Sequence, residues 1–247
     1  GSVTLFHDIT ALKKIDQLKT DFVSIVAHEI KSPLNSVLMQ LNVILDGLAG
    51  DLTEKQEQIL QRASDRIKLL TALSSELLDL SKIESGLINQ DREELSIGEL
   101  IRDQVADFQE QADTKSIHLS VKETGKEIRM MGNRTNIEEV VSNLISNAIQ
   151  YSPNGGKIEV CTDENSDCAV IKVSDEGLGI SEKDLENIFE RFFRVKNEKT
   201  RYINGTGLGL SIVKSIVEAH HGSIEVESTE GEGTCFSVFF PKSEYKI

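Results

Sequence analysis

The stretch NGTGLGLSIVK, residues 204–214, carries three glycines directly before an amphipathic helical pattern. Glycine lets a backbone approach a ligand closely, and the unpaired first-turn amides of a helix lie at the positive end of its dipole. The segment therefore favours phosphate binding. It is not a P-loop, because G-x-x-x-x-G-K-[ST] is absent, and it lacks the strand-then-helix context of a dinucleotide fold. A glycine-rich turn of this kind is weak evidence when taken alone.

Two upstream segments strengthen the indication of a nucleotide site. NLISNAIQYS, residues 143–152, puts Asn143 and Asn147 on one face of a helix. An amide oxygen can ligate Mg²⁺, and an amide nitrogen can donate to phosphate, although such a pair also fits an exposed polar stripe. VSDEGLGI, residues 173–180, ends an apolar strand at Asp175. That carboxylate can accept a hydrogen bond from an exocyclic amine such as that of adenine, although D-x-G-x-G alone equally fits a tight turn.

The pattern around these segments predicts a domain of mixed secondary structure. A capping box, Ser96 to Glu99, opens a helix that extends to about Asp113. Strands and helices do not alternate strictly, so we expect an α+β fold with a mixed sheet and helices on one face. The further strands are expected at 117–121, 128–130, 158–162, 170–174, 224–227 and 235–240, and the further helices at 136–150, 182–193 and 208–220.

The first third of the chain predicts two long helices. Apolar residues follow heptad spacing at Leu12, Ile15, Leu18, Phe22 and Ile25, and again at Leu60, Ala63, Ile67, Leu70 and Leu77. The first helix is expected to end near Leu45, before Gly47 and Gly50. The second begins at the capping box Thr53 to Gln56 and ends near Glu84. Since a lone hairpin cannot bury both seams, we expect a second copy to complete a four-helix bundle. A helical pair folded onto the rest of the chain stays open.

Composition excludes some classes of partner. The 247 residues carry a formal net charge of -14, which argues against nucleic acid or an anionic membrane as the main partner. The three cysteines lack metal-type spacing and fit a reduced cytoplasmic setting as structural residues. No apolar run approaches the ~18 residues of a membrane span, and no signal peptide is present. Because Gly1-Ser2 has the look of a cloning scar, we expect an excerpt of a longer protein that can be membrane-anchored elsewhere.

SIVAHEIKSPLNS, residues 24–36, adds an ionisable His28 beside Glu29 on the first helix, with Pro33 expected to bend the helix just beyond. With this stretch included, the chain resembles the cytoplasmic catalytic core of a bacterial sensor histidine kinase. AHEIKSPL resembles the H box of that family, NLISNAIQYS its N box and DEGLGI its G1 box. FERFFR resembles the F box, GTGLGL the G2 box and GEGTCFSVFFP the final glycine-threonine segment. The resemblance covers nearly everything from Leu12 to Pro241.

The resemblance implies a multidomain chain with an all-α helical hairpin, forming a dimeric four-helix bundle, followed by an α+β two-layer Bergerat-type (GHKL) ATP-binding sandwich. Residues 12–88 would form the dimerisation and histidine phosphotransfer hairpin, and residues 89–247 the catalytic ATP-binding domain. Residues 1–11 would be a tag plus the tail of an upstream PAS-like sensor domain, since FHDITALKK resembles the end of a PAS domain. The implied partners are a second copy of the chain and the receiver domain of a response regulator.

The same resemblance implies roles on the hairpin. His28 would attack the γ-phosphate of ATP, and Glu29 would take or orient its Nδ1 proton so that Nε2 attacks. The phosphoryl group would pass to an aspartate of the response regulator. Ser32 stands where relatives that also dephosphorylate their regulator often have Thr or Asn, and its hydroxyl leaves phosphatase activity toward the regulator open.

In the second domain the resemblance implies an ATP and Mg²⁺ site. Asn147 would ligate Mg²⁺ with Asn143 beside the phosphates, and Asp175 would bind the adenine amine with Thr234 at the same edge. Gln150 stands where many members carry a phosphate-contacting lysine, which leaves phosphate positioning open, and Lys196 or Arg194 could compensate. The remaining implied nucleotide contacts are Tyr151, Gly177, Gly179, Arg194, Gly205, Thr206, Gly207, Leu208 and Gly209, while Phe189, Phe192 and Phe193 are expected to pack and position a nucleotide lid.

Two other functions stay open. The chain could be a dimeric scaffold that binds nucleotide without catalysis. This alternative stays open because Gln150 carries no charge where many relatives have a lysine that contacts phosphate. An ATPase motor or chaperone could share the nucleotide fold and hydrolyse ATP without a histidine intermediate. The capped helical hairpin with His28 and Glu29 weighs against the second reading. The stimulus, the regulator and phosphorylation in cis or in trans do not follow from the sequence.

Overall fold

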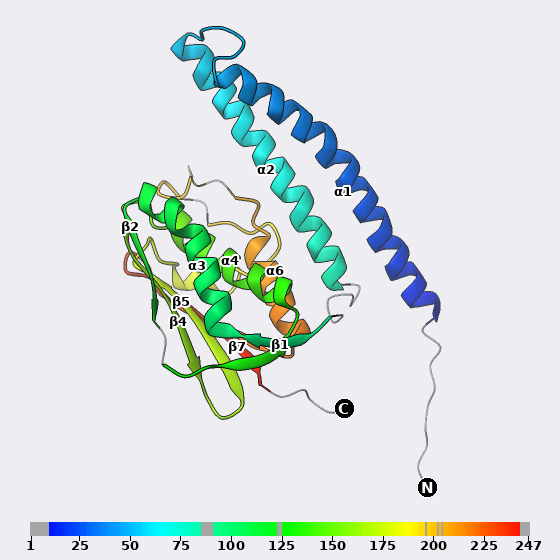
Figure 1. Cartoon of the computed structure of the whole chain (residues 1–247), viewed down its shortest axis with the longest axis vertical. Coiled ribbons are helices and arrows are strands. Elements are labelled where there is room, and N and C mark those ends of the chain that lie inside the picture. Colours follow the sequence, from blue (N-terminus) through cyan, green and yellow to red (C-terminus); the bar gives the residue numbers. More distant parts are fainter. Residues whose placement is uncertain are drawn as a thin grey trace. The chain divides into compact units, whose positions relative to one another are not determined.

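The computed structural model describes residues 10–84, 91–122, 125–195, 197–201, 203 and 205–242. The chain divides into two compact units, Gly1–Leu87 and Ile88–Ile247, which Figure 1 draws as a helical hairpin and a sheet covered by helices. The predicted PAS-like tail, at residues 1–11, lies almost entirely outside the described residues, and the predicted domain boundary between residues 88 and 89 lies outside them as well. No helix among the described residues combines the length and the apolar character needed to cross a membrane.

Two long helices form the hairpin, as predicted. Helix α1 spans Thr10–Leu45 and continues through Pro33, and α2 spans Glu54–Glu84. The predicted capping box forms, because the backbone amide of Thr53 donates to Gln56 Oε1 at 2.9 Å and the amide of Gln56 donates to Thr53 Oγ1 at 3.4 Å. Local signals thus set both helix ends at the turn.

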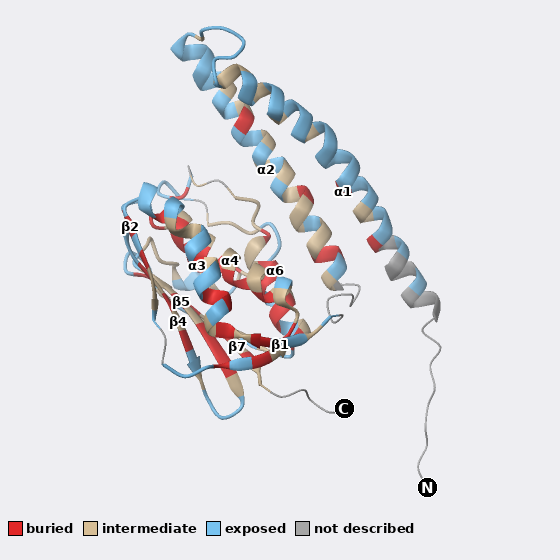
Figure 2. Ribbon diagram, in the orientation of Figure 1, coloured by how far each residue is buried: buried red, intermediate tan, exposed pale blue. Residues whose placement is uncertain are grey.

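One hairpin leaves much of its apolar seam uncovered (Figure 2). Leu18, Phe22 and Ile25 of α1 are 61%, 68% and 62% exposed. The contact between the two helices is partly polar, since Thr20 Oγ1 donates to the Ser81 carbonyl at 3.4 Å. Further exposed apolar side chains on the two helices are Val26, Ile30, Val37, Met39, Val43, Ile59, Leu70 and Leu77.

The second unit has two layers, which confirms the predicted α+β sandwich. A five-stranded sheet has the order β2-β4-β5-β7-β6, in which β2 and β4 are parallel and the other neighbours antiparallel. Helices α3 (Ile97–Thr114), α4 (Arg134–Gln150) and α6 (Gly209–Ala219) cover one face (Figure 1). The strands are β2 (Ile117–Lys122), β4 (Gly156–Glu164), β5 (Cys168–Asp175), β6 (Ser223–Thr229) and β7 (Gly233–Pro241).

Helix α4 lies at the centre of the core. Its side chains Val140, Val141, Leu144 and Ile145 have no exposed surface, as do Ile212, Val213 and Ile216 of α6. The apolar positions recur at helical spacing and face the sheet, so the remaining face of α4 carries Asn143 and Asn147 half-buried. Burial of the apolar face therefore orients the two asparagines.

Three predictions about this unit were wrong in detail. A short strand β1 (Glu93–Ser96) was missed, and it pairs with β3 (Arg129–Gly132). The capping box at Ser96 does not form its side-chain bond. Ser96 is the last residue of β1, and the amide of the following Ile97 donates to the Ile128 carbonyl at 3.0 Å. The helix expected at 182–193 is limited to α5 (Glu182–Leu185), and the segment then turns, with Phe192 in left-handed backbone at a φ of 63°.

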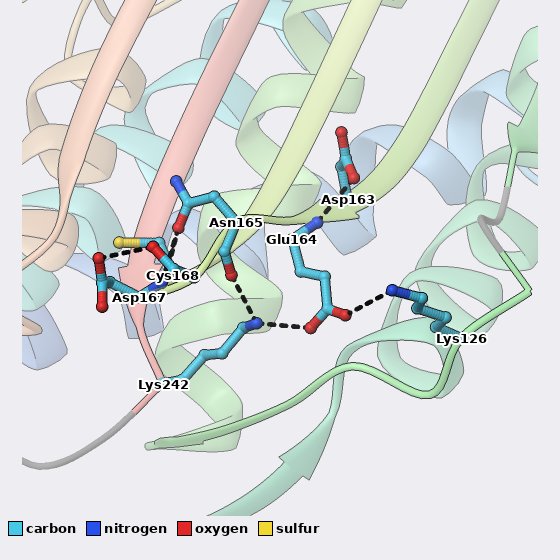
Figure 3. Close-up of polar contacts among 8 residues, drawn as sticks. Lys126, Asp163, Glu164, Asn165, Asp167, Cys168 and Lys242 are labelled. Carbon is cyan, nitrogen blue, oxygen red and sulfur yellow. Dashed lines mark hydrogen bonds and ion pairs between the residues drawn. The ribbon is translucent and has the colours of Figure 1, made fainter.

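A polar cluster fastens one end of the sheet (Figure 3). Beyond β7, Lys242 binds Glu164 through its ammonium group and donates from its backbone amide to the Asp167 carbonyl at 2.9 Å. Lys126 reaches the other carboxylate oxygen of Glu164 at 3.4 Å. The register places Cys168 opposite Pro241 at this end and Asp175 opposite Thr234 at the other. The cluster therefore holds the end of the sheet opposite the candidate site.

Candidate functional site

The candidate site of the second unit begins with a row of polar side chains at the end of the sheet. Asp175 of β5 pairs with Thr234 of β7, which pairs with Ser228 of β6. The Asp175 carboxylate accepts the Gly177 amide at 2.9 Å. Burial raises the pKa of Asp175 above its ordinary value, while hydrogen bonds from the backbone of Gly177 and Thr234 oppose this rise. A half-buried carboxylate with preset orientation is suited to accept a hydrogen bond from a ligand.

The turn after β5 is joined to the end of α4. The Leu178 amide donates to the carbonyl of Tyr151, the residue that caps α4, at 2.9 Å. Next to it, Ser152 is 2% exposed, and its Oγ has no hydrogen-bond partner among the described residues. This junction brings the predicted residues Tyr151, Asp175 and Gly177 together.

Gly179 requires both a left-handed backbone and close contact. Its φ is 64°, and a Cβ there would lie 2.0 Å from the Thr229 carbonyl oxygen. We expect Gly179→Ala to lower the free energy of unfolding by at least ~2 kcal/mol, since left-handed backbone alone costs a non-glycine residue ~1–2 kcal/mol. Thermal denaturation of the whole chain measures the loss. Gly125→Ala is the control, because Gly125 has a φ of 77° with nothing within 4 Å of a Cβ. Equal losses for the two variants would contradict the close contact.

The glycine-rich segment is clamped to the turn that carries Phe192. The Phe192 amide donates to the Gly207 carbonyl at 2.9 Å, and a Cβ on Gly207 would lie 2.8 Å from the Phe192 carbonyl carbon. Phe192 itself is 58% exposed, so it contributes through its backbone rather than through the packing predicted for its ring. Phe189 is half-buried, and Lys214 Nζ lies 5.7 Å from its ring centroid.

The two asparagines of α4 have different surroundings. Asn143 donates through Nδ2 to the Glu139 carbonyl at 2.9 Å, and its Oδ1 lies against the Cα of Gly209, where a Cβ would stand 2.7 Å away. Asn143 therefore joins α4 to the start of α6. Asn147 is half-buried one turn further along, and its side chain makes no hydrogen bond within the part of the chain that the structure describes. Asn147 is thus the better placed of the two to hold a ligand.

The remaining predicted residues lie around the glycine-rich segment. Gln150 Oε1 is 3.8 Å from the position of a Cβ on Gly205. The Leu208 amide donates to Thr206 Oγ1 at 3.2 Å, and Leu208 is fully buried. Arg194 donates through Nη2 to the Ile203 carbonyl, so its guanidinium braces the segment predicted to form a lid. Lys196, the other predicted cation, lies outside the described residues.

A separate candidate site is on α1 of the hairpin. The side chain of His28 is 80% exposed and that of Glu29 is 78% exposed, and His28 Nδ1 lies 3.9 Å from Glu29 Oε1. Ser32, one turn along the helix, is exposed as well. A neutral imidazole that projects into solvent can act as a nucleophile, and a neighbouring carboxylate can orient its proton.

Sequence reasoning missed Ser228 and Ser152. Ser228 had a usable signal, because β6 alternates as SIEVEST and its inward positions read Ile224, Val226, Ser228. A hydroxyl at the inward end of a strand needs a partner. Ser152 had no comparable signal, since its burial depends on the turn after β5 packing against it.

Mg²⁺ was predicted at Asn147. Mg²⁺ prefers oxygen ligands and is commonly bound by one or two protein groups together with substrate phosphates. The side chain of Asn147 offers an amide oxygen that no described residue occupies, so it fits this mode of binding. Among the described residues no group of three or more His, Cys, Asp or Glu side chains forms a metal cage of the other type.

Two family models match the chain. Residues 18–86 match the His Kinase A (phospho-acceptor) domain, and residues 132–244 match the histidine kinase-, DNA gyrase B-, and HSP90-like ATPase. The first match contains His28 and Glu29. The second contains both asparagines, Asp175 and the glycine-rich segment.

Curated relatives match almost the whole chain. The sensor histidine kinase WalK of Bacillus subtilis is 32% identical over 246 residues, 99% of this chain and 40% of its own length. The sensor protein SrrB of Staphylococcus aureus is 32% identical over 244 residues, 99% of this chain and 42% of its own length. The chain thus spans about two fifths of the length of these relatives.

Solved structures support the same fold. Full-length ShkA, crystallised in complex with AMPPNP, is similar with a TM-score of 0.72 and 20% identity over 92% of this chain and 47% of that one. A catalytic domain of the histidine kinase ThkA has a TM-score of 0.56 and 31% identity, with 63% of this chain and 100% of that one covered.

Proposed function

Because the chain belongs to the bacterial sensor histidine kinase family, we propose that it phosphorylates itself on His28 with Mg-ATP. The phosphoryl group then passes to an aspartate on the receiver domain of a response regulator. The observation that carries this proposal is the exposure of the His28 side chain, at 80%, beside Glu29 in a chain that also holds a carboxylate, Asp175, oriented by the Gly177 amide. An ATPase or chaperone has no need of such a histidine.

The transfer step follows from the chemistry of the imidazole. His28 Nε2 attacks the γ-phosphorus, an N–P bond forms, and the bond from that phosphorus to the bridging oxygen breaks as ADP leaves. Glu29 Oε1 orients or takes the Nδ1 proton, and the present separation of 3.9 Å shortens by rotation of two exposed side chains. The resulting phosphoramidate is a high-energy link, which makes onward transfer to an aspartate favourable.

The residues of the second unit would hold the nucleotide. Asp175 accepts the adenine amine, and Tyr151 borders the base or ribose. The glycine-rich segment and the uncapped start of α6 face the phosphates, where backbone amides and the helix dipole favour anions. Asn147 would hold Mg²⁺, which supplies positive charge to the phosphate oxygens. Gln150 donates a neutral hydrogen bond where many relatives place a lysine, and Arg194 supplies a nearby cation.

We propose the same division of the chain into domains that the sequence predicts. Residues 12–88 act as the dimerisation and phosphotransfer hairpin, residues 89–247 bind ATP in the cytoplasm, and residues 1–11 close an upstream PAS-like sensor domain. Ser32 keeps a hydroxyl one turn from His28, so it can orient water for dephosphorylation of the regulator.

Autophosphorylation is tested with γ-labelled Mg-ATP and the whole chain. The proposal predicts protein-bound label that is labile to acid and stable to base, which distinguishes a phosphohistidine from a phosphoserine. Nucleotide binding without label would instead identify a silent scaffold. Release of inorganic phosphate without a labelled protein would identify an ATPase.

Dimerisation is tested at the exposed seam. Phe22→Glu is expected to raise the dimer dissociation constant at least ~100-fold, because each dimer loses two buried phenyl groups worth ~1.5–3 kcal/mol each. Sedimentation equilibrium measures the loss as a shift towards the chain mass of 27.4 kDa. Leu48→Glu is the control, since Leu48 is 77% exposed in the turn between the helices rather than on the seam. A monomeric parent chain would contradict the bundle.

A further inference from the structure

The hydroxyl of Ser228 is the centre of a hydrogen-bond cluster that none of the proposed roles uses. It accepts the Ile180 amide at 2.8 Å and donates to the Gly233 carbonyl at 2.8 Å. It also lies 2.9 Å from Thr234 Oγ1, in a contact that either hydroxyl could donate. Ser228 and Thr234 are paired neighbours on β6 and β7, and Thr234 is 8% exposed.

Counting protons settles the direction of the ambiguous contact. A hydroxyl has one proton, an amide N–H can only donate, and a carbonyl can only accept. The single proton of Ser228 is therefore directed to Gly233, so the contact with Thr234 uses the proton of Thr234. The reverse assignment would put two oxygen lone pairs face to face between Ser228 and Gly233. Thr234 consequently has only lone pairs left for a ligand.

The row formed by Asp175 and Thr234 therefore offers a ligand only hydrogen-bond acceptors. Thr234 is the paired neighbour of Asp175, whose carboxylate also accepts hydrogen bonds. An exocyclic amine, as in adenine, can donate to either group. A keto oxygen at the same place, as in hypoxanthine or guanine, would face two acceptors and leave them unpaired, which is the basis of strong discrimination in hydrogen-bonding sites.

We infer that Ser228 is a positioning residue that makes this site select adenine over 6-keto purines, by holding the proton of Thr234 away from the base. The inference rests on the proposed function, because it assumes that the base lies against Asp175 and Thr234. The proposed effect of Ser228 on the base is exerted through Thr234, with which its hydroxyl shares a hydrogen bond.

The test compares binding of Mg-ADP and Mg-IDP to the whole chain by calorimetry, since neither nucleotide can be used to phosphorylate the chain. Ser228→Ala is expected to lower the ratio of the IDP to the ADP dissociation constant roughly tenfold, the equivalent of one ordinary hydrogen bond. The freed proton of Thr234 can then be donated to the keto oxygen of IDP. Ser228→Thr keeps the hydroxyl and is expected to keep the parent ratio.

A matched control removes a hydroxyl from the other face of the sheet. Ser174 pairs with Cys235, and its Oγ donates to Cys235 Sγ at 3.1 Å, away from the polar row. Ser174→Ala is expected to leave the ratio unchanged. In a Thr234→Val background, Ser228→Ala is likewise expected to have no further effect on the ratio, because the hydroxyl through which it acts is gone.

Thr234→Val alone gives an independent result, should Ser228→Ala fail to fold. If Thr234 only accepts, its loss weakens ADP and spares IDP. A greater loss for IDP would overturn the proton assignment, and an equal loss of both nucleotides in Ser228→Ala would reduce Ser228 to a structural residue. A parent chain that binds neither nucleotide would overturn the proposed function itself, whereas one that binds both equally would overturn only the selectivity.

Discussion

Replacing His28 by glutamine is expected to abolish protein-bound label from γ-labelled ATP, with a fall of at least ~10³-fold in the rate of autophosphorylation. Glutamine is of similar length and polarity, but its amide nitrogen is not nucleophilic, so no N–P bond can form. Because the side chain of His28 is 80% exposed, its replacement is not expected to alter the fold. Filter-bound radioactivity after acid-free washing measures the label, and Mg-ADP binding is expected to stay at the parent value.

The matched control is His118→Gln. His118 is an exposed histidine on β2, so it tests the loss of an imidazole away from α1. Its label is expected to equal that of the parent chain. Persistent acid-labile label in His28→Gln would place the phosphoacceptor elsewhere and overturn the role proposed for His28. Mixing His28→Gln chains with Asn147→Ala chains then separates the two modes of transfer, since label appears only if one protomer phosphorylates its partner.

The parts of the fold that could be predicted from the sequence are those determined by residues close together in the chain. The ends of α1 and α2 follow from the capping box at Thr53 and from glycines in the turn, which act over four or five residues. Strand β1 was missed because its pairing with β3 joins residues far apart in the chain. The helix predicted beyond Leu185 failed for the same reason, since Phe192 takes its left-handed backbone in contact with Gly207.

The residues of the candidate site show the same division between those set by local sequence and those set by contacts between distant segments. Gly179 and Gly207 could be predicted as special positions because left-handed backbone and close approach of another segment restrict the residue type at a single position. Asp175 could be singled out because it ends an apolar strand. Ser228 could not be given a role, because its effect depends on the register of β6 against β7 and on three contacts, one with Ile180 and two with β7. Which proton points where is a property of the assembled cluster, and no local pattern encodes it.

Replacing Asp175 by asparagine is expected to weaken binding of Mg-ADP about 100-fold, or ~2.7 kcal/mol, since hydrogen bonds to charged groups are the stronger ones. Asparagine keeps one acceptor for the Gly177 amide but turns an NH₂ group towards donors, namely the Thr234 amide or the adenine amine. Calorimetric titration measures the loss. Asp163→Asn is the matched control, because Asp163 is exposed on β4 and, within the described part of the chain, accepts only the amide of its neighbour Glu164.

Asp175→Asn is expected to weaken nucleotide binding without lowering the stability of the fold. Measuring both quantities therefore separates a loss of nucleotide recognition from a loss of folding. Burial raises the pKa of Asp175 in the folded chain above its unfolded value, so the folded state binds this proton more tightly. The ionised group therefore opposes folding above the raised pKa, and this cost disappears as the pH falls through it. Asp175→Asn is expected to melt no lower than the parent chain at pH 7 and to lose that part of the pH dependence. A variant that loses nucleotide binding and also melts well below the parent would show that Asp175 supports the fold rather than the base.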